Sequence, residues 1–141
     1  MAFKGAYLDH LAAVPLFAAC TKKDLQTIAK AADEITVPAG TVLVDQGQAG
    51  REAYIIVDGT ATVRRNGKKI TTLGAGAIVG ELSLLDRGPR TATVTADTSL
   101  TVLVIDQRHF AAVIDDVPAL AHKLLSALAG RIRDLDRQTF G

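Results

Sequence analysis

The chain has 141 residues and a formal net charge of +1, with 48% hydrophobic and 22% charged residues. This length and composition are typical of one globular domain, and the balanced charge gives no electrostatic reason to expect binding to nucleic acid or to a membrane. Cys20 is the one cysteine, which excludes an internal disulfide, and no apolar run reaches the roughly 20 residues that a membrane-spanning helix needs. We therefore expect a single cytoplasmic domain over residues 1–141.

Helical signals dominate residues 1–33. A short helix around Leu11 is expected to end before Pro15, because proline disfavours a helical residue in front of it. A second helix is expected to begin after Thr21, since Asp24 stands three residues later, close to the capping-box pattern. The apolar residues of this second helix recur at helical spacing and predict one buried face: Leu25, Ile28, Ala29 and Ala32.

Between residues 34 and 105 the pattern changes to short β-branched runs of the kind found in strands. The runs cover residues 42–44, 53–57, 60–63, 70–73, 91–96 and 100–105. Turn signals separate them, and we expect the pairs Asp58-Gly59 and Asn66-Gly67 to close β-hairpins, because tight hairpin turns need positive φ. Several short strands at nearly regular spacing predict a β-sandwich or barrel, and we expect a jelly roll (double-stranded β-helix) with flanking helices.

Helical signals return in residues 106–141. One helix is expected from Asp106-Gln107 to about Ile114, and another should begin near Pro118, after a break. This last helix carries an apolar stripe at helical spacing: Leu120, Leu124, Leu128, Ile132 and Leu135. Such a helix could contact a second copy of the chain or an effector protein.

One stretch carries most of the functional information. Residues 80–94 read Gly-Glu-Leu-Ser-Leu-Leu-Asp-Arg-Gly-Pro-Arg-Thr-Ala-Thr-Val, which combines a glycine turn, a short helical turn, a Gly-Pro break and Arg90 at the start of a strand. Free backbone N–H groups at a helix start hold anions, and an arginine offers a fork of donors matched to phosphate oxygens. Glu81 beside such an anion would need a different partner, such as a ribose hydroxyl. The stretch therefore predicts a phosphate site.

The same stretch resembles the phosphate-binding cassette of the cyclic nucleotide-binding domain, a module shared by the catabolite activator protein, kinase regulatory subunits and cyclic-nucleotide-gated channels. The matching residues are Val79-Gly80-Glu81-Leu82-Ser83-Leu84 and Pro89-Arg90-Thr91-Ala92-Thr93-Val94. The resemblance implies N-terminal helices over 1–33, a jelly roll over 34–105 with its cassette at 79–94, and lid helices over 106–141.

The resemblance also implies a role for each cassette residue. Gly80 opens the cassette turn, and Arg90 holds the exocyclic phosphate oxygens of the ligand. The backbone N–H groups around Leu82 and Ser83 cap the same phosphate. Glu81 accepts a hydrogen bond from the ribose 2′-OH. The implied ligand is cyclic AMP or cyclic GMP, with no further cofactor.

Selection of the base depends on Thr91 and on the last helix. Threonine after the cassette arginine is frequent in family members that respond to cyclic GMP, although it could also be an ordinary strand former. Strict alternation would turn Arg90 and Thr91 to opposite faces, so both reach a ligand only if regular pairing begins after them. The resemblance makes Arg133, Asp136 and Arg137 possible lid residues over the base. They could also form a solvated helix face with local ion pairs.

The expected function is a non-catalytic sensor that couples ligand occupancy to movement of the C-terminal helices. His10, His109 and His122 do not stand at metal-ligand spacing with a carboxylate, and no nucleophile motif is present, so we expect neither a metal site nor an enzyme. Two alternatives remain. The jelly roll could be a constitutive protein-interaction module without ligand switching, or the chain could be a regulatory fragment of a larger transcription factor, channel or enzyme.

Overall fold

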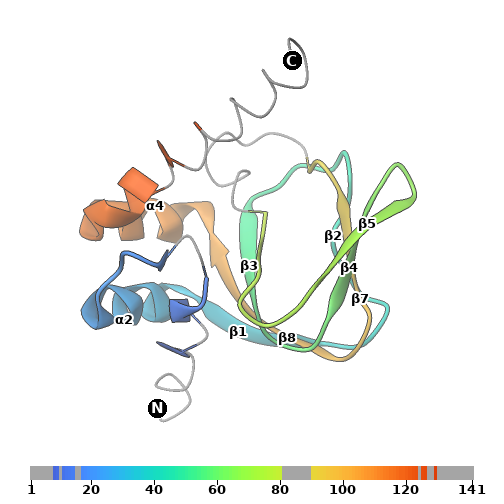
Figure 1. The fold of residues 1–141 in the computed structure, drawn as a ribbon, viewed down its shortest axis with the longest axis horizontal. Coiled ribbons are helices and arrows are strands. Elements are labelled where there is room, and N and C mark those ends of the chain that lie inside the picture. Colours follow the sequence, from blue (N-terminus) through green and yellow to red (C-terminus); the bar gives the residue numbers. More distant parts are fainter. Residues whose placement is uncertain are drawn as a thin grey trace.

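The computed structural model describes residues 8–9, 11–14, 17–80, 90–123, 125–126 and 129. In these ranges the chain folds into two layers of strands with helices against one of them (Figure 1). No helix within the described ranges is both long enough and apolar enough to cross a membrane.

In the described part of the chain, eight antiparallel strands form two four-stranded sheets, which confirms the predicted jelly roll. The strands are β1 (Asp33–Val37), β2 (Val42–Val44), β3 (Glu52–Asp58), β4 (Ala61–Arg65), β5 (Lys68–Leu73), β6 (Ile78–Val79), β7 (Thr93–Ala96) and β8 (Leu100–Asp106). One sheet has the order β1-β8-β3-β6 and the other has the order β2-β7-β4-β5. The first strand therefore pairs with the last, from Asp33 opposite Val104 to Val37 opposite Leu100.

The two predicted hairpin turns have different outcomes. Asn66 and Gly67 join β4 to its neighbour β5 with φ angles of 54° and 78°, as expected for a tight hairpin. The Asp58-Gly59 prediction was wrong, because this turn carries the chain from β3 in one sheet to β4 in the other. Gly59 has a φ of 97°, and a side chain there would overlap the carbonyl oxygen of Ser99. Glycine at this position therefore lets two turns approach each other closely.

The strand boundaries also differ from the sequence pattern in places. Strands β1 and β6 were not among the predicted runs; β1 is an edge strand with mostly exposed residues, and β6 is two residues long. The run expected over residues 91–96 begins pairing at Thr93. Such short or exposed strands are defined by their partners in the sheet rather than by their own composition.

Helix α2 (Lys22–Ala31) confirms the predicted capping box. The Thr21 hydroxyl accepts from the Asp24 N–H at 3.1 Å, and the Asp24 carboxylate accepts from the Thr21 N–H at 3.0 Å. The predicted apolar face is buried, and all four of its residues lie in the core: Leu25, Ile28, Ala29 and Ala32. Farther upstream, Leu11 is helical and fully buried, while Pro15 lies outside the described residues.

Helix α4 (Gln107–Asp116) follows β8 directly and ends two residues beyond the predicted end. Asp106 caps it, accepting from the His109 N–H at 2.8 Å. The described residues from Pro118 onward are helical as expected, and Leu120 is buried, whereas Leu124, Leu128, Ile132 and Leu135 fall outside the described residues.

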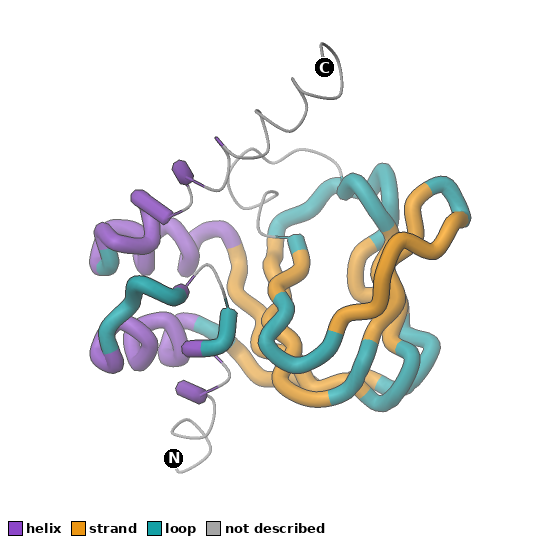
Figure 2. Tube along the Cα trace, viewed as in Figure 1, coloured by secondary structure: helices purple, strands orange, loops and turns teal. Residues whose placement is uncertain are grey.

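Alternation along β3 divides the core into two clusters. Ala53, Ile55 and Val57 face α2 and α4, where they pack with Leu103 and Ile105 of β8. Ile56 faces the interior between the sheets, together with Val102, Val94 and Val79. Figure 2 shows the helices gathered on one side of the strands. The interior between the sheets is therefore separated from the helices by one sheet.

Candidate functional site

Arg90 lies where the chain re-enters the barrel, three residues before β7, and its side chain is turned inward. It is 8% exposed, so the guanidinium has left water almost completely. Its Nη2 donates to the Glu52 carbonyl at 2.7 Å, and its Nη1 donates to the Gly80 carbonyl at 3.3 Å. These two bonds hold the plane of the guanidinium against the start of β3 and the end of β6.

Gly80 makes room for this arginine. It follows β6 with a φ of 83°, a conformation that side chains disfavour. A Cβ on Gly80 would overlap the Arg90 guanidinium and lie 3.1 Å from the Glu52 carbonyl oxygen. The structure thus brings together two of the predicted site residues, Gly80 and Arg90, and glycine is required there for two separate reasons.

The charge of Arg90 has no anionic partner in the described part of the chain. The one contact of salt-bridge length found there joins the His109 ring to the Asp106 carboxylate at 2.8 Å, on the surface at the start of α4. Both described partners of Arg90 are neutral carbonyls. A buried cation is costly to desolvate unless an opposite charge comes close. Within the described residues, Arg90 is therefore a buried cation without a counter-charge.

Tyr54 is a component of the site that the sequence analysis did not identify. It is half-buried on the inward side of β3, and its hydroxyl donates to the Glu52 carboxylate at 3.4 Å. Burial raises the pKa of Tyr54, and the negative charge of Glu52 raises it further, whereas the positive charge of Arg90 lowers it. The phenol therefore stays neutral and lies within electrostatic reach of the arginine. A polar residue at an inward position of an alternating strand is the signal that could have revealed it.

The loop between β2 and β3 fixes the backbone of Arg90. The Gly47 N–H donates to the Arg90 carbonyl at 2.9 Å, and the Arg90 N–H donates to the Gln48 carbonyl at 2.8 Å. Farther along, the Thr93 hydroxyl accepts from the Gln46 N–H at 3.0 Å and donates to the Asp45 carboxylate at 3.1 Å. This loop was predicted as a turn, but its contacts with Arg90 could not be read from the sequence, because the two segments are far apart along the chain.

Thr91 is adjacent to the buried arginine but exposed to solvent. Regular pairing begins at Thr93, after Thr91, so the alternation that would separate Arg90 from Thr91 does not apply. The Thr91 carbonyl accepts from Nε of Arg65 at 3.1 Å. The remaining predicted site residues lie outside the described residues: Glu81, Leu82 and Ser83 of the cassette, and Arg133, Asp136 and Arg137 of the lid.

Among the described residues no group of His, Cys, Asp and Glu side chains could hold a metal ion. Cys20 is partly buried beside α2, where burial raises the pKa of its thiol and nearby Asp24 raises it further. The contact between Asp106 and His109 is explained by helix capping at the start of α4. In the described part of the chain, the charged group that the site offers is thus the Arg90 guanidinium.

Comparison with known proteins identifies what the chain resembles. The sequence model of the cyclic nucleotide-binding domain matches residues 34–116. The chain is 37% identical over 105 residues to the cAMP-dependent protein kinase regulatory subunit of Schizosaccharomyces pombe, covering 74% of this chain and 26% of that protein. It is 32% identical over 129 residues to the potassium/sodium hyperpolarization-activated cyclic nucleotide-gated channel 3 of Mus musculus, covering 91% of this chain and 16% of the channel.

A solved structure agrees with these matches. The catabolite activator protein of Thermus thermophilus superposes with a TM-score of 0.81 and 28% identity, over 89% of this chain and 61% of that one. The three proteins carry different names, and the chain spans about a quarter of the kinase subunit and about a sixth of the channel. What they have in common with this chain is the part that includes the barrel.

Proposed function

The chain belongs to the cyclic nucleotide-binding domain family, and we propose that it is a non-catalytic sensor of cyclic AMP or cyclic GMP. Arg90 is the observation that carries this proposal. Its buried guanidinium has carbonyl partners, but it has no carboxylate partner among the described residues. A cyclic phosphate would supply the missing negative charge, and a guanidinium matches its two exocyclic oxygens with parallel donors.

The rest of the cassette completes the ligand contacts in this proposal. Gly80 leaves room for the arginine, and the N–H groups of Leu82 and Ser83 cap the phosphate. Glu81 accepts from the ribose 2′-OH. These assignments follow the family motif residue by residue, and the position of Gly80 against Arg90 supports the first of them.

Two observations support different bases for the bound nucleotide. The kinase regulatory subunit that the chain resembles is named for its dependence on cAMP, which supports cyclic AMP. Thr91 is exposed next to the buried Arg90 and precedes regular strand pairing, which supports the hydroxyl contact that would favour cyclic GMP. Arg133, Asp136 and Arg137 are proposed to close over the base.

Occupancy would be transmitted through the C-terminal helices. A ligand shifts the balance between an open and a closed arrangement of the helices only by its difference in affinity for these two arrangements. Contacts that the lid makes with the ligand in the closed arrangement would therefore couple binding to helix movement. The output would belong to a second copy of this chain or to an effector protein that contacts the last helix. We propose a cytoplasmic setting with no direct contact to nucleic acid or membrane.

Thermal unfolding with cyclic AMP, cyclic GMP and 5′-AMP tests the proposal. At a hundredfold excess over its dissociation constant, a specific ligand adds ~2.7 kcal/mol to the free energy of unfolding, which raises the midpoint by several degrees. We expect one or both cyclic nucleotides to raise the midpoint and 5′-AMP to have little effect.

Arg90→Ala should remove most of this shift, whereas Arg64→Ala should preserve it. Arg64 is a matched control because it is an exposed arginine on β4. An absence of any shift with both cyclic nucleotides would refute the sensor and favour the constitutive interaction module. A shift that survives in Arg90→Ala would move the binding site elsewhere. Thr91→Ala should weaken cyclic GMP more than cyclic AMP if the threonine hydroxyl contacts the base.

A further inference from the structure

The tip of the β4–β5 hairpin is joined to the β2–β3 loop by a pair of side-chain hydrogen bonds. Nε2 of Gln46 donates to Oδ1 of Asn66 at 2.8 Å, and Oε1 of Gln46 accepts from the Asn66 backbone N–H at 2.9 Å. Both side chains are exposed, and they are 20 positions apart in the sequence. The side-chain amide of Gln46 thus caps the hairpin turn from outside.

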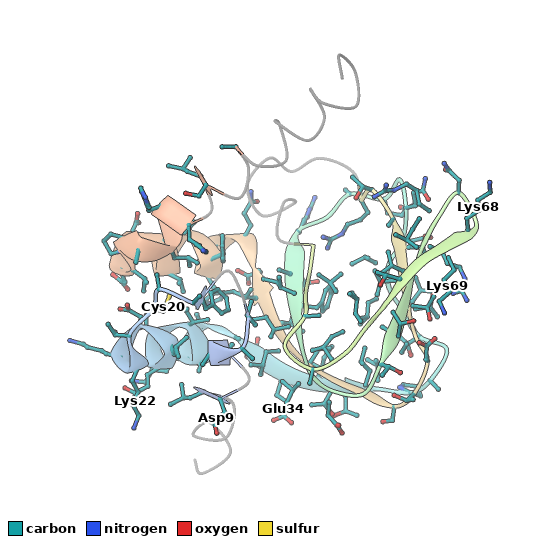
Figure 3. All side chains as sticks on the ribbon, in the orientation of Figure 1. Asp9, Cys20, Lys22, Glu34, Lys68 and Lys69 are labelled. Atoms are coloured by element: carbon teal, nitrogen blue, oxygen red, sulfur yellow. The ribbon has the colours of Figure 1, made fainter. Side chains whose placement is uncertain are left out.

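The hairpin does not need this contact in order to close. Strands β4 and β5 pair directly, and Asn66 with Gly67 already forms the positive-φ turn between them. The hairpin lies on the side of the barrel away from α2 and α4, where Lys68 and Lys69 are labelled in Figure 3. The pair of bonds therefore adds a connection between the hairpin and the loop that the sheet itself does not require.

The loop held by Asn66 is the one that fixes the backbone of Arg90. Gln46 is followed by Gly47, whose N–H donates to the Arg90 carbonyl at 2.9 Å, and by Gln48, whose carbonyl accepts from the Arg90 N–H at 2.8 Å. Both backbone groups of the arginine are thus bonded to the two residues that follow Gln46. A shift of this loop would move the main chain that carries the guanidinium.

The neighbouring hairpin residue reaches the other side of the same segment. Nε of Arg65 donates to the Thr91 carbonyl at 3.1 Å. Two consecutive hairpin residues thereby restrain Arg90. Arg65 acts through Thr91, the residue after Arg90, and Asn66 acts through the β2–β3 loop. The hairpin, the loop and residues 90–93 form one hydrogen-bonded unit.

We infer that Asn66 is a positioning residue for the phosphate-binding arginine, acting through Gln46 although it does not touch the ligand. The inference rests on the proposed function, since it concerns how tightly the site holds a cyclic nucleotide. The hairpin bonds keep the backbone of Arg90 in the binding-competent position before the ligand arrives. Preorganisation of this kind raises affinity because less ordering remains to be done on binding.

The test compares Asn66→Gly, Gln46→Ala and the double variant in calorimetric titration with cyclic AMP and cyclic GMP. Glycine preserves the positive φ at position 66 while removing the side chain. Asn66→Gly removes the bond to Oδ1 and keeps the one donated by the backbone N–H, so we expect it to weaken binding by about threefold to tenfold, equivalent to one ordinary hydrogen bond. The double variant should lose about as much as Gln46→Ala alone, because both changes break the same contact.

Thr71→Ala is the matched control, since Thr71 is an exposed residue of β5 whose hydroxyl donates to the adjacent Thr72 carbonyl. It should leave affinity within about twofold of the original, the error usual for such comparisons. Amide hydrogen exchange without ligand gives an independent measurement. In Asn66→Gly the amides of Gly47 and Arg90 should exchange faster, while the amide of Ala96, bonded to the Thr41 carbonyl, should not change.

The outcomes separate this inference from the proposed function. If the unaltered chain binds a cyclic nucleotide and Asn66→Gly binds it equally well, the positioning role is refuted and the sensor remains. Additive losses in the double variant would show that Asn66 does not act through Gln46, and would also refute it. If the unaltered chain binds neither nucleotide, both proposals fail. Should Asn66→Gly prove unfolded, the same decision rests on Gln46→Ala, which leaves the hairpin turn unaltered.

Discussion

The two ends of strand β7 offer opposite solutions to burying a polar side chain. Among the described residues, Thr62 and Arg90 are the buried polar or charged ones, at 5% and 8% exposure. Thr62 hydrogen-bonds to Asp97, just after β7, and its hydroxyl lies 2.8 Å from both carboxylate oxygens. Arg90, just before β7, has two neutral carbonyls as described partners.

The difference lies in where the charge is placed. At the Thr62 end the charged group, Asp97, is exposed and hydrated, and the buried group is neutral, so that end is complete in itself. At the Arg90 end the charge itself is buried, and its described partners do not neutralise it. Stability alone explains the first arrangement. For the second we propose a ligand as the explanation, and variants at each end of β7 separate the two explanations.

The largest expected effect is that of Arg90→Met. Loss of one partner from a buried charge pair costs ~2–5 kcal/mol, so affinity for the cyclic nucleotide should fall by roughly thirtyfold to several thousandfold. Without ligand, an unbranched apolar side chain of similar length should leave the free energy of unfolding within ~1 kcal/mol of the original, because the desolvation cost of the cation disappears. Calorimetric titration and denaturant unfolding measure the two quantities, with Arg64→Met as the control. A large loss of stability without ligand would make Arg90 a structural residue like Thr62.

Gly80→Ala should damage the same end sterically. The positive φ costs ~1 kcal/mol for a residue with a side chain, and overlap with the arginine adds ~1–3 kcal/mol, measured as a fall in the free energy of unfolding. Affinity should fall with it, because the guanidinium is displaced. Gly40→Ala is the control, since Gly40 has a similar φ of 89° and a Cβ added there would meet nothing within 4 Å. Equal losses in the two variants would exclude the overlap with Arg90.

Thr62→Val should give the converse result. It removes a buried hydroxyl bonded to a carboxylate that water can solvate, so the chain should lose ~1–2 kcal/mol of stability. Affinity for the cyclic nucleotide should be unchanged, because the altered residue is at the other end of β7. Thr95→Val, on β7 itself, controls for the added methyl group. A marked loss of affinity in Thr62→Val would mean that the two ends are coupled.

The smallest effect concerns the ionisation of Tyr54. Because burial and Glu52 raise its pKa, the neutral phenol favours folding; this contribution is fully present below the ordinary pKa of ~10 and is lost as the pH rises through the folded value. Arg90→Met should raise the pKa of Tyr54 further, since the arginine lowers it. Titration of tyrosinate absorbance measures this change, and Thr62→Val should leave the pKa unaltered. An unchanged pKa in Arg90→Met would place the arginine farther from the phenol than the structure has it.

Local sequence patterns predicted the features that depend on near neighbours. The capping box of Thr21 and Asp24 and the Asn66-Gly67 turn each use residues within a few positions of one another, and both were confirmed. The barrel followed from the number and spacing of short strands. The cassette assignments came from the motif and stay predictions; the structure shows only that Gly80 lies against Arg90.

Features that join distant segments could not be predicted in this way. The Asp58-Gly59 pair has the composition of a hairpin turn, but its two strands belong to different sheets. The role of Tyr54 depends on the side of β3 that faces inward, and the contact of Gln46 with Asn66 depends on two turns meeting in space. In each case tertiary packing determines which segments meet, and the composition of one segment does not indicate which distant segment it contacts.

The pairing of β1 with β8 determines how the domain would respond to mechanical force. Helix α2 leads into β1 at Asp33, and α4 follows β8, whose Val104 lies opposite that residue. Tension applied through the two helices therefore enters both strands at the same end and would open their bonds one pair at a time, as in a zipper, rather than shearing them together. An optical-trap experiment with handles on α2 and α4 should record a lower opening force than handles that pull along the strands. Embedded in a longer chain, the barrel would be compliant along this direction, whereas β7, which pairs in the other sheet, lies outside the pair of strands that takes the initial load.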